Sequence, residues 1–218
     1  MGEGLIQRVL HNAEERRDRI LNGKVNCIPS PFKTFKYDFP GVELGTYYLV
    51  SGSAKASKSK ITNFLFLYNT ILYAYEHPNL VKIKIFYALL EEKAENITGK
   101  FICYLLYTLS AGRIRIDIKT FKSVDQSRVL SQDILDILKH ADYQAILNFY
   151  EEHVTFIQDR NPTGIFHTLE RYAETHGKIH RKKVDGYDKE VFDYYEPDNP
   201  EEYVICIVDH IGLEISRP

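Results

Sequence analysis

Short apolar runs of strand length alternate along this chain with longer segments of helical periodicity. The predicted strands are Tyr47–Val50, Lys82–Leu90, Val154–Ile157 and Tyr203–Val208. The predicted helices are Ile61–Tyr75, Glu95–Leu109, Ile165–His176 and two short helices in residues 128–152, with Leu135, Ile137, Leu138 and Ile146 facing inward. This alternation predicts an α/β fold, in which a mostly parallel sheet carries helices on both faces.

Two segments precede the alternating pattern. Residues 1–24 predict an amphipathic helix of about five turns that ends at Gly23. Its apolar positions are Leu5, Val9, Leu10 and Ile20. The prolines Pro29 and Pro31 exclude a helix from residues 25–35, which we interpret as an extended linker. The α/β domain then occupies residues 36–218.

Residues 181–202 interrupt the pattern between a predicted helix and a predicted strand. The basic residues Arg181, Lys182 and Lys183 come first, and acidic residues and tyrosines follow. We interpret this stretch as a solvated excursion. The alternatives are that the basic cluster contacts phosphates and that the acidic part contacts a partner.

The most distinctive motif follows the first predicted strand. It reads Gly52, Ser53, Ala54, Lys55, Ala56, Ser57, Lys58 and Ser59. This is the phosphate-binding pattern G-x-x-x-x-G-K-[ST], with Ser57 in place of the second glycine, in the strand–loop–helix context that the motif requires. Loop N–H groups and the positive helix end would bind a polyphosphate. Lys58 would neutralise the β and γ phosphates, and the Ser59 hydroxyl would bind Mg²⁺. The alternative is a lysine- and serine-rich turn.

Ser57 weakens the match, because a left-handed backbone there would cost an L-residue about 1–2 kcal/mol. Acidic residues end two of the other predicted strands. Asp209 follows Tyr203–Val208 and could hold the Mg²⁺ shell, since ligands gather at the carboxyl ends of parallel strands. Glu91 and Glu92 end Lys82–Leu90, and one of them could polarise an attacking water. The alternatives are an ordinary strand end and a helix cap.

Four segments together resemble the ATPase domain of DnaB-type replicative helicases, in the family's order. Residues 41–52 resemble the start of that domain, and Leu90–Ile97 matches its L-E-x-x-A-E-x-I. Residues 161–165 resemble its T-P-T-E-I, and residues 208–211 resemble its D-Y-L. The resemblance covers roughly residues 36 to 214, apart from an insertion near 181–202. Lys55 before the lysine–serine pair makes the loop more similar to phage-encoded members.

The resemblance implies a RecA-like P-loop NTPase core that binds ATP and Mg²⁺. It assigns phosphate and Mg²⁺ binding to Lys58 and Ser59, catalysis to Glu91 with Lys58, and the second metal-shell position to Asp209. It also implies a homo-oligomer, a hexameric ring in the complete protein, that moves on single-stranded DNA. In this family a helix before the ATPase domain packs on the adjacent subunit. Residues 1–24 are similar to it in place and length, and the alternative is that they fold back on their own domain.

The chain ends at Pro218, shortly after the Asp209 strand. In the implied fold further strands follow this one. They carry the DNA-binding loops and an arginine that reaches the nucleotide bound by a neighbouring subunit. We therefore expect this sequence to be a piece of a helicase or a shortened natural relative, incomplete at its C-terminus.

Composition is that of one ordinary globular domain, with 218 residues, 44% of them hydrophobic and 27% charged. The net charge of −2 gives no general attraction to nucleic acid, so a DNA contact would have to be local. No apolar run approaches the ~20 residues of a membrane helix, and the start does not resemble a secretory signal. We expect a cytoplasmic protein, in a bacterium or a phage-infected host, with no membrane contact.

The cysteines and histidines add no site. Cys27, Cys103 and Cys206 lack C-x-x-C spacing and are expected to be reduced and mostly buried. His176 and His180 would share one face of a helix, but the basic residues around them oppose a zinc site.

Three functions remain open on the sequence. The leading hypothesis is the ATP-hydrolysing domain of a DnaB-like helicase that unwinds DNA during replication. The second is a non-catalytic or degenerate P-loop protein that acts as an assembly or loader partner, which Ser57 and the short chain favour. The third is a RecA-like recombination ATPase, which shares the loop and the acidic strand.

Overall fold

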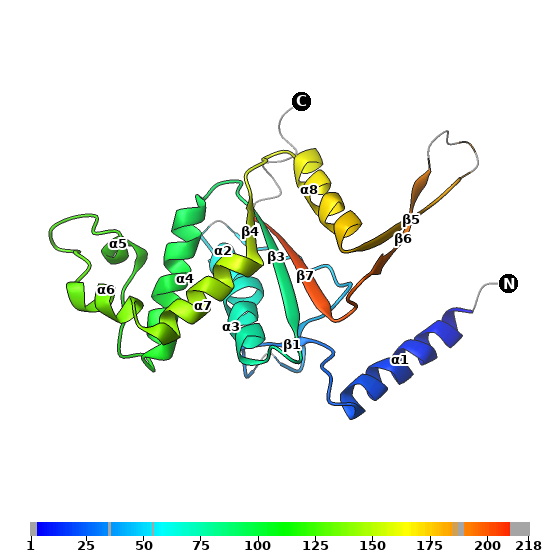
Figure 1. The fold of residues 1–218 in the computed structure, drawn as a ribbon, viewed down its shortest axis with the longest axis horizontal. Helices are drawn as coiled ribbons and strands as arrows, with labels where there is room; N and C mark the ends of the chain where they lie inside the picture. The colour runs from blue at the N-terminus through cyan, green and yellow to red at the C-terminus, as the bar shows by residue number, and fades with distance from the viewer. Residues whose placement is uncertain (1–3, 35, 54, 185, 187–189, 210–218) are drawn as a thin grey trace. The chain divides into compact units, whose positions relative to one another are not determined.

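The computed structural model describes residues 4–34, 36–53, 55–184, 186 and 190–209 (Figure 1). The chain divides into two compact units, residues 1–83 and 84–218. The boundary falls inside strand β3 (Lys82–Ala88).

The first unit contains helix α1, a pair of short strands and one long helix that is built from three segments. Helix α1 (Leu5–Leu21) comes first, followed by an antiparallel pair of strands, β1 (Ile28–Pro29) and β2 (Gly41–Val42). The long helix then runs through α2 (Lys58–Thr62), the π-helical stretch η1 (Asn63–Tyr68) and α3 (Asn69–Glu76). The predicted helix Ile61–Tyr75 and the predicted N-terminal helix are confirmed.

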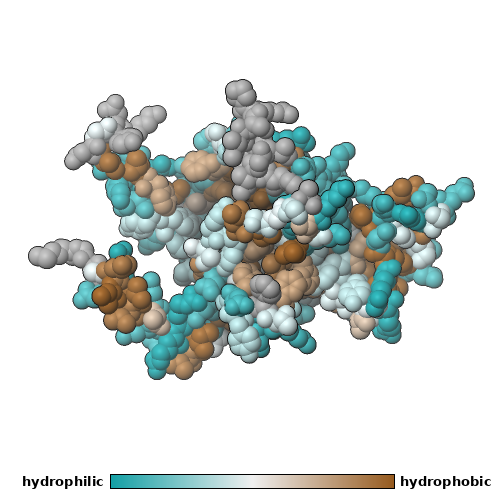
Figure 2. Space-filling view, turned by 180° about the vertical axis from the view of Figure 1, so that it is seen from behind, coloured by the Kyte–Doolittle hydropathy of each residue, from teal (hydrophilic) through white to brown (hydrophobic). Residues whose placement is uncertain are grey.

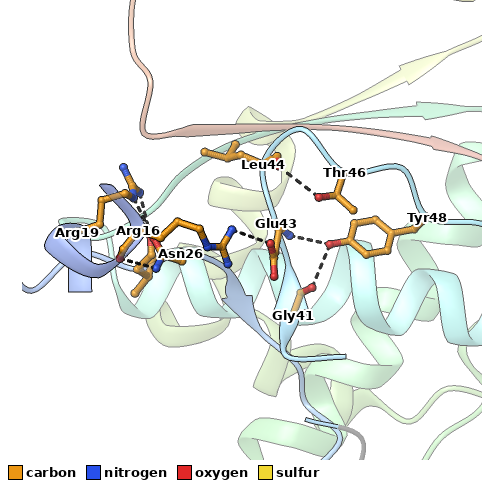
Figure 3. A network of polar contacts seen from close by, with 9 residues as sticks. Arg16, Arg19, Asn26, Gly41, Glu43, Leu44, Thr46 and Tyr48 are labelled. Atoms are coloured by element: carbon orange, nitrogen blue, oxygen red, sulfur yellow. Dashed lines mark hydrogen bonds and ion pairs between the residues drawn. The ribbon is translucent and has the colours of Figure 1, made fainter. Parts of the chain in front are cut away.

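The core of the first unit forms where the long helix meets the strand pair. Ile28, Leu67 and Ile71 are fully buried. The Tyr48 ring packs against Phe39 and Phe66, with centroids 5.4 and 5.2 Å away. Its hydroxyl accepts a hydrogen bond from the Glu43 N–H at 2.8 Å and donates one to the Gly41 carbonyl at 3.2 Å (Figure 3). Tyr48 therefore holds the turn after β2 in place.

Two arginines near the C-terminal end of α1 hold the helix to residues that follow it. The Arg16 guanidinium forms a 2.9 Å ion pair with Glu43, and the Arg19 guanidinium donates to the Val25 carbonyl at 2.8 Å (Figure 3). None of its residues is buried, and its apolar side chains are more than half exposed. Apolar surface gathers beside the first residues of the chain in Figure 2. The polar side chains near the end of α1 thus contact its own unit, as the fold-back alternative expects. The apolar face of α1 is exposed to solvent.

The second unit contains most of the predicted pattern. After β3 come α4 (Ala94–Leu109), α5 (Ile118–Phe121), α6 (Gln132–Leu138), α7 (Ala141–His153), β4 (Val154–Ile157), α8 (Pro162–Thr175), β5 (Gly177–Lys182), β6 (Val191–Pro197) and β7 (Glu202–Val208). The predicted strands at β3, β4 and β7 and the predicted helices at α4, α6, α7 and α8 are confirmed.

Strand β3 is the centre of a three-stranded parallel sheet with the order β4-β3-β7. Ile85 pairs with Val154, and Ala88 pairs with Ile157. Side chains alternate between the faces of a strand, and Ile85, Phe86, Tyr87 and Ala88 are all buried. Both faces of β3 are therefore covered, as a central parallel strand requires.

Helix α8 covers one face of this sheet. Ile165 packs with Phe86, Ala88 and Ile157, and Tyr172 sits edge-on to Phe86 with the ring centroids 5.1 Å apart. Figure 1 draws α4 and α7 on the other side of the strands. These two helices are joined by the stacked rings of Phe101 and Tyr150, with centroids 4.5 Å apart. The structure thus supports a mixed α/β fold compatible with a RecA-like or Rossmann-like core.

The buried Tyr150 phenol predicts alkaline instability. Burial raises its pKa from 10 to about 12, although a hydrogen bond with Thr98 opposes the shift. The folded state therefore holds this proton more tightly than the unfolded chain, so the stabilisation is complete below pH 10 and is lost as pH rises. We expect this group to lower the free energy of unfolding by about 1.4 kcal/mol per pH unit between pH 10 and 12. Urea unfolding at pH 9, 10 and 11 measures the loss.

Tyr150→Phe is the matched variant for this measurement, because it keeps the ring that stacks on Phe101. The variant should lose stability less steeply above pH 10 than the native chain. Equal slopes would show that Tyr150 does not carry the effect, and the Cys103 thiol, whose pKa burial raises to about 11, would be the next group to replace.

The start of α8 is capped by a side chain. The Asn161 side chain accepts hydrogen bonds from the Thr163 and Gly164 N–H groups at 2.7 and 3.2 Å, and Pro162 occupies the first helical position. Asn161→Ala should lower the free energy of unfolding by about 1 kcal/mol in urea titration. Asn148→Ala is the control, because this side chain is exposed in the middle of α7, and it should leave stability unchanged or slightly raise it. A similar loss in both variants would contradict the capping role.

The predicted buried strand Tyr47–Val50 is wrong. These residues belong to no strand, and the Tyr47 and Leu49 side chains are 77% and 69% exposed. A strand is stable only when a neighbouring strand satisfies its backbone N–H and C=O groups. No described strand pairs with residues 47–50. The apolar run was a sign of strand propensity but carried no information on a partner.

The predicted linker is also wrong in part. Residues 27–32 are extended, but Ile28 is fully buried and pairs with Val42. The segment is therefore part of the folded first unit. Among the inward-facing predictions for residues 128–152, Leu138 and Ile146 are buried, whereas Leu135 is 39% exposed. Cys206 is likewise exposed rather than buried.

The predicted excursion at 181–202 contains a β-hairpin, β5 and β6, with an irregularity between His180 and Arg181. Its basic cluster is largely neutralised, because Arg181 pairs with Glu170 at 2.7 Å and Lys182 pairs with Asp193 at 2.8 Å. No helix among the described residues is long and apolar enough to cross a membrane.

Candidate functional site

The loop before α2 has the backbone of an anion-binding turn. Ser57 is left-handed, with φ 61° and ψ 28°, and Lys58 begins the helix directly after it. Lys55 is also left-handed, with φ 64°. A left-handed residue followed by a helical one turns successive N–H groups to the same side, which makes a concave site for anions. The φ of Ser57 is positive, so this serine adopts a left-handed conformation that glycine adopts freely and that costs an L-residue free energy.

The Lys58 side chain lies back over this loop. Its Nζ donates hydrogen bonds to the Gly52 and Ser53 carbonyls, both at 3.0 Å. A Cβ on Gly52 would lie 3.3 Å from the Ala56 Cβ and 3.7 Å from the Lys58 Cγ. Gly52 therefore leaves room for Ala56, and the lysine stem passes it at ordinary contact distance. An arriving phosphate would find the ammonium group already held at the loop, bonded to carbonyls that it can exchange for phosphate oxygens.

The rest of the loop is accessible. Gly52, Ser53, Lys55, Ala56 and Ser57 are exposed, and Ser59 is half-buried in the first turn of the helix. Ala54 lies outside the described residues. The Ile61 N–H donates to the Ser57 carbonyl at 3.1 Å, so the helix begins at the loop without a break.

The long helix behind the loop widens into the π-helical stretch η1 after its first five residues. The buried Thr70 hydroxyl donates to the Leu65 carbonyl at 3.2 Å. Single π-helical turns are frequent at functional sites. The motif did not signal this feature, because the residues of η1 are ordinary helix formers and aromatics.

The predicted acidic residues follow neighbouring strands of the second unit. Asp209 comes directly after β7, and Glu91 lies three residues past the end of β3. Because β3 and β7 are adjacent and parallel, both carboxylates belong to the same edge of the sheet. Glu91 is exposed, and Asp209 is half-buried.

Glu92 differs from Glu91 in its surroundings. Its carboxylate forms a 2.6 Å ion pair with Lys100 of α4. Such a pair orients the carboxylate toward the helix, which suits a structural role.

The sequence analysis missed a third acid at this edge. Asp159 follows β4 by two residues and is exposed. Its carboxylate lies against the first turn of α8, since a Cβ on Gly164 would come within 2.5 Å of the Asp159 Cγ. The signal was the same as for Glu91 and Asp209, an acid just past an apolar strand.

No metal site is complete in these side chains alone. Among the described residues, no three His, Cys, Asp or Glu side chains gather closely enough to hold a metal ion. Mg²⁺ usually binds through one or two carboxylates together with substrate phosphates and waters, so such an ion would need few protein ligands.

The two histidines are used differently from a zinc pair. His176 stacks on Tyr172 with ring centroids 3.9 Å apart, whereas His180 lies on β5, stacks on Tyr194 and contacts Glu196 at 3.0 Å.

Comparison of the chain with protein-family models, curated proteins and solved structures gave no match. The resemblance to DnaB-type helicases therefore rests on the four motifs. Of these, His210 and Ile211 in the segment similar to D-Y-L lie outside the described residues.

Proposed function

We propose that this chain is the ATP-binding and hydrolysing part of a DnaB-like replicative DNA helicase, similar to those that phages encode. The observation that carries the proposal is the loop 52–59. It combines a left-handed Ser57, a lysine held over the loop carbonyls and a long helix that begins at once. These are the three physical components of a polyphosphate site: oriented N–H groups, a mobile cation and a positive helix end.

The proposed roles follow from the chemistry of each group. Lys58 releases the Gly52 and Ser53 carbonyls and binds the β and γ phosphates, while the Ser59 hydroxyl and Asp209 contribute to the Mg²⁺ shell. Glu91 accepts the proton of the attacking water. The partners that complete this function are further copies of the chain in a hexameric ring and single-stranded DNA.

A second candidate function is a degenerate P-loop protein that serves as an assembly or loader partner. Two observations favour it: the non-glycine Ser57 at φ 61°, and the absence of a strand at residues 47–50. In a working phosphate loop the preceding segment is normally anchored in the sheet.

Titration of the chain with a fluorescent ATP analogue and Mg²⁺ tests the proposal. Saturable binding that unlabelled ATP displaces supports it, whereas no binding up to millimolar nucleotide supports the degenerate alternative. ATP hydrolysis by the same preparation then separates a motor domain from a nucleotide-binding partner.

A further inference from the structure

An unusually basic segment follows helix α4. From Gly112 to Arg128 there are five cationic and two acidic residues, although the net charge of the whole chain is −2. We define the cationic strip as Arg113, Arg115, Lys119 and Lys122. None of the four forms an ion pair within the part of the chain that the structure describes, in contrast to Arg181 and Lys182 of the hairpin.

Burial alternates residue by residue along this segment. Ile114, Ile116 and Ile118 are half-buried, whereas Arg113, Arg115 and Lys119 are exposed. The apolar side chains therefore attach the segment to the protein, and the charged side chains are exposed to solvent. Asp117 is the one acid among them, and its carboxylate already caps α5 by accepting the Thr120 N–H at 2.8 Å.

The backbone of the strip is held on α4 at both ends. At the C-terminal end of α4, the Ile114 N–H donates to the Ser110 hydroxyl at 2.8 Å. Nearer its N-terminus, a Cβ on Gly99 would lie 2.6 Å from the Ile118 Cδ1, so this glycine lets α5 approach closely. The Lys122 amine contacts the Asn96 side chain. A fixed backbone lowers the ordering cost of binding a ligand along the strip.

One hydrogen bond orients each of the two arginine side chains and leaves further N–H donors on the guanidinium group. The Arg113 Nε donates to the Ser110 carbonyl at 3.0 Å, and the Arg115 Nε donates to the Gly112 carbonyl at 2.9 Å. These bonds complement the negative end of α4 and account for one donor of each side chain. A guanidinium has five N–H donors, so the terminal nitrogens can bind phosphate oxygens.

An exposed aromatic ring lies beside the cations. Tyr107 is 46% exposed, and the Arg115 guanidinium lies 5.5 Å from its ring centroid. Unpaired bases stack on such rings while cations bind the neighbouring phosphates, and this combination is typical of single-strand binding surfaces. An acidic peptide would use the cations but gains no stacking partner from Tyr107.

We propose that Tyr107 and the cationic strip form a binding surface for single-stranded DNA. The choice of DNA rests on the proposed function, whereas the surface itself does not depend on nucleotide binding. One base stacks on Tyr107, and the phosphates on either side bind Arg113, Arg115 and Lys119.

The test is fluorescence anisotropy of a labelled thymidine oligonucleotide of about 20 residues, without nucleotide, from about 50 to 200 mM salt. The double variant Arg115→Gln/Lys119→Gln should weaken binding at least about tenfold at the lowest salt. It should also lower the log–log salt slope by about 1.4, since each phosphate contact to a single strand contributes about 0.7. Tyr107→Leu should weaken binding about fivefold or more with an unchanged slope.

Lys178→Gln removes a cation from exposed β5 and is the matched control, with no expected change. Thermal unfolding checks that each variant is folded. The proposal is overturned if the native chain does not bind the oligonucleotide at about 50 mM salt, if the double variant binds as the control does, or if polyglutamate binds the strip as tightly as the DNA. Lys58→Ala should leave DNA binding intact, so failure of the nucleotide site and failure of this surface are separate results.

Discussion

Replacing Lys58 with alanine is expected to weaken binding of a fluorescent ATP analogue by at least about 30-fold. The side chain is the cation held directly over the loop, where its Nζ bonds the Gly52 and Ser53 carbonyls. A hydrogen bond to a charged group contributes about 2 kcal/mol, and this energy corresponds to about 30-fold in affinity. Equilibrium titration with Mg²⁺ present measures the change.

Two variants control this experiment. Lys58→Met keeps the stem that crosses Gly52 but removes the charge, so it should bind as weakly as the alanine variant. Lys60→Ala removes an exposed lysine two residues further along the same helix and should bind nearly as the native chain does. If all three variants bind equally well, residues 52–59 are an ordinary turn.

Ser57→Gly decides between the motor and the degenerate alternative. Ser57 is left-handed in the folded protein, so its conformational cost of about 1–2 kcal/mol is part of the free energy of folding. The working-loop proposal therefore expects affinity within about threefold of the native chain, since the loop is preformed. Binding that appears only in the glycine variant identifies a degenerate site.

The second large effect is expected for hydrolysis. Glu91→Gln should lower the rate of ATP hydrolysis by about 100- to 10,000-fold and leave nucleotide affinity nearly unchanged. Glutamine has the size of glutamate but cannot accept the proton of the attacking water. A phosphate-release assay at saturating nucleotide measures the rate, and titration of the same preparation confirms binding.

Glu92→Gln is the matched control, because Lys100 holds this neighbouring carboxylate at 2.6 Å. We expect less than a tenfold loss of rate from it. If hydrolysis survives in Glu91→Gln and is lost in Glu92→Gln, the two roles must be exchanged. A native chain that binds nucleotide without hydrolysing it would instead favour the partner function.

The positions of β3, β4 and β7 were predictable, because a buried apolar run of this length can fold stably in few other ways. A short, continuously apolar run such as Ile85–Ala88 can be stable only when both its faces are covered. The cap of α8 was equally local, since Asn161 followed by Pro162 reads as a helix start in almost any context. The acids Glu91 and Asp209 were found because an acid after such a strand is itself a local pattern.

Elements that depend on a partner strand were not predictable in the same way. Tyr47–Val50 has the same apolar character as β4, yet only β4 pairs with β3. The hairpin β5 and β6 was missed, because its exposed strands carry charged and aromatic residues with no clear apolar alternation. Asp159 became part of the acidic edge only when β4 was placed beside β3.

The sequence alone determined the helices α1, α4, α6, α7 and α8, the long helix after the loop, the strands β3, β4 and β7, the phosphate-loop pattern and the acids at two strand ends. Each of these depends on neighbours within a few residues. The tertiary structure decided the strand order, the left-handed Ser57, the position of Lys58 over its loop and the exposed cations beside Tyr107. These features depend on hydrogen bonds and packing between groups whose relative positions are set only when the chain folds.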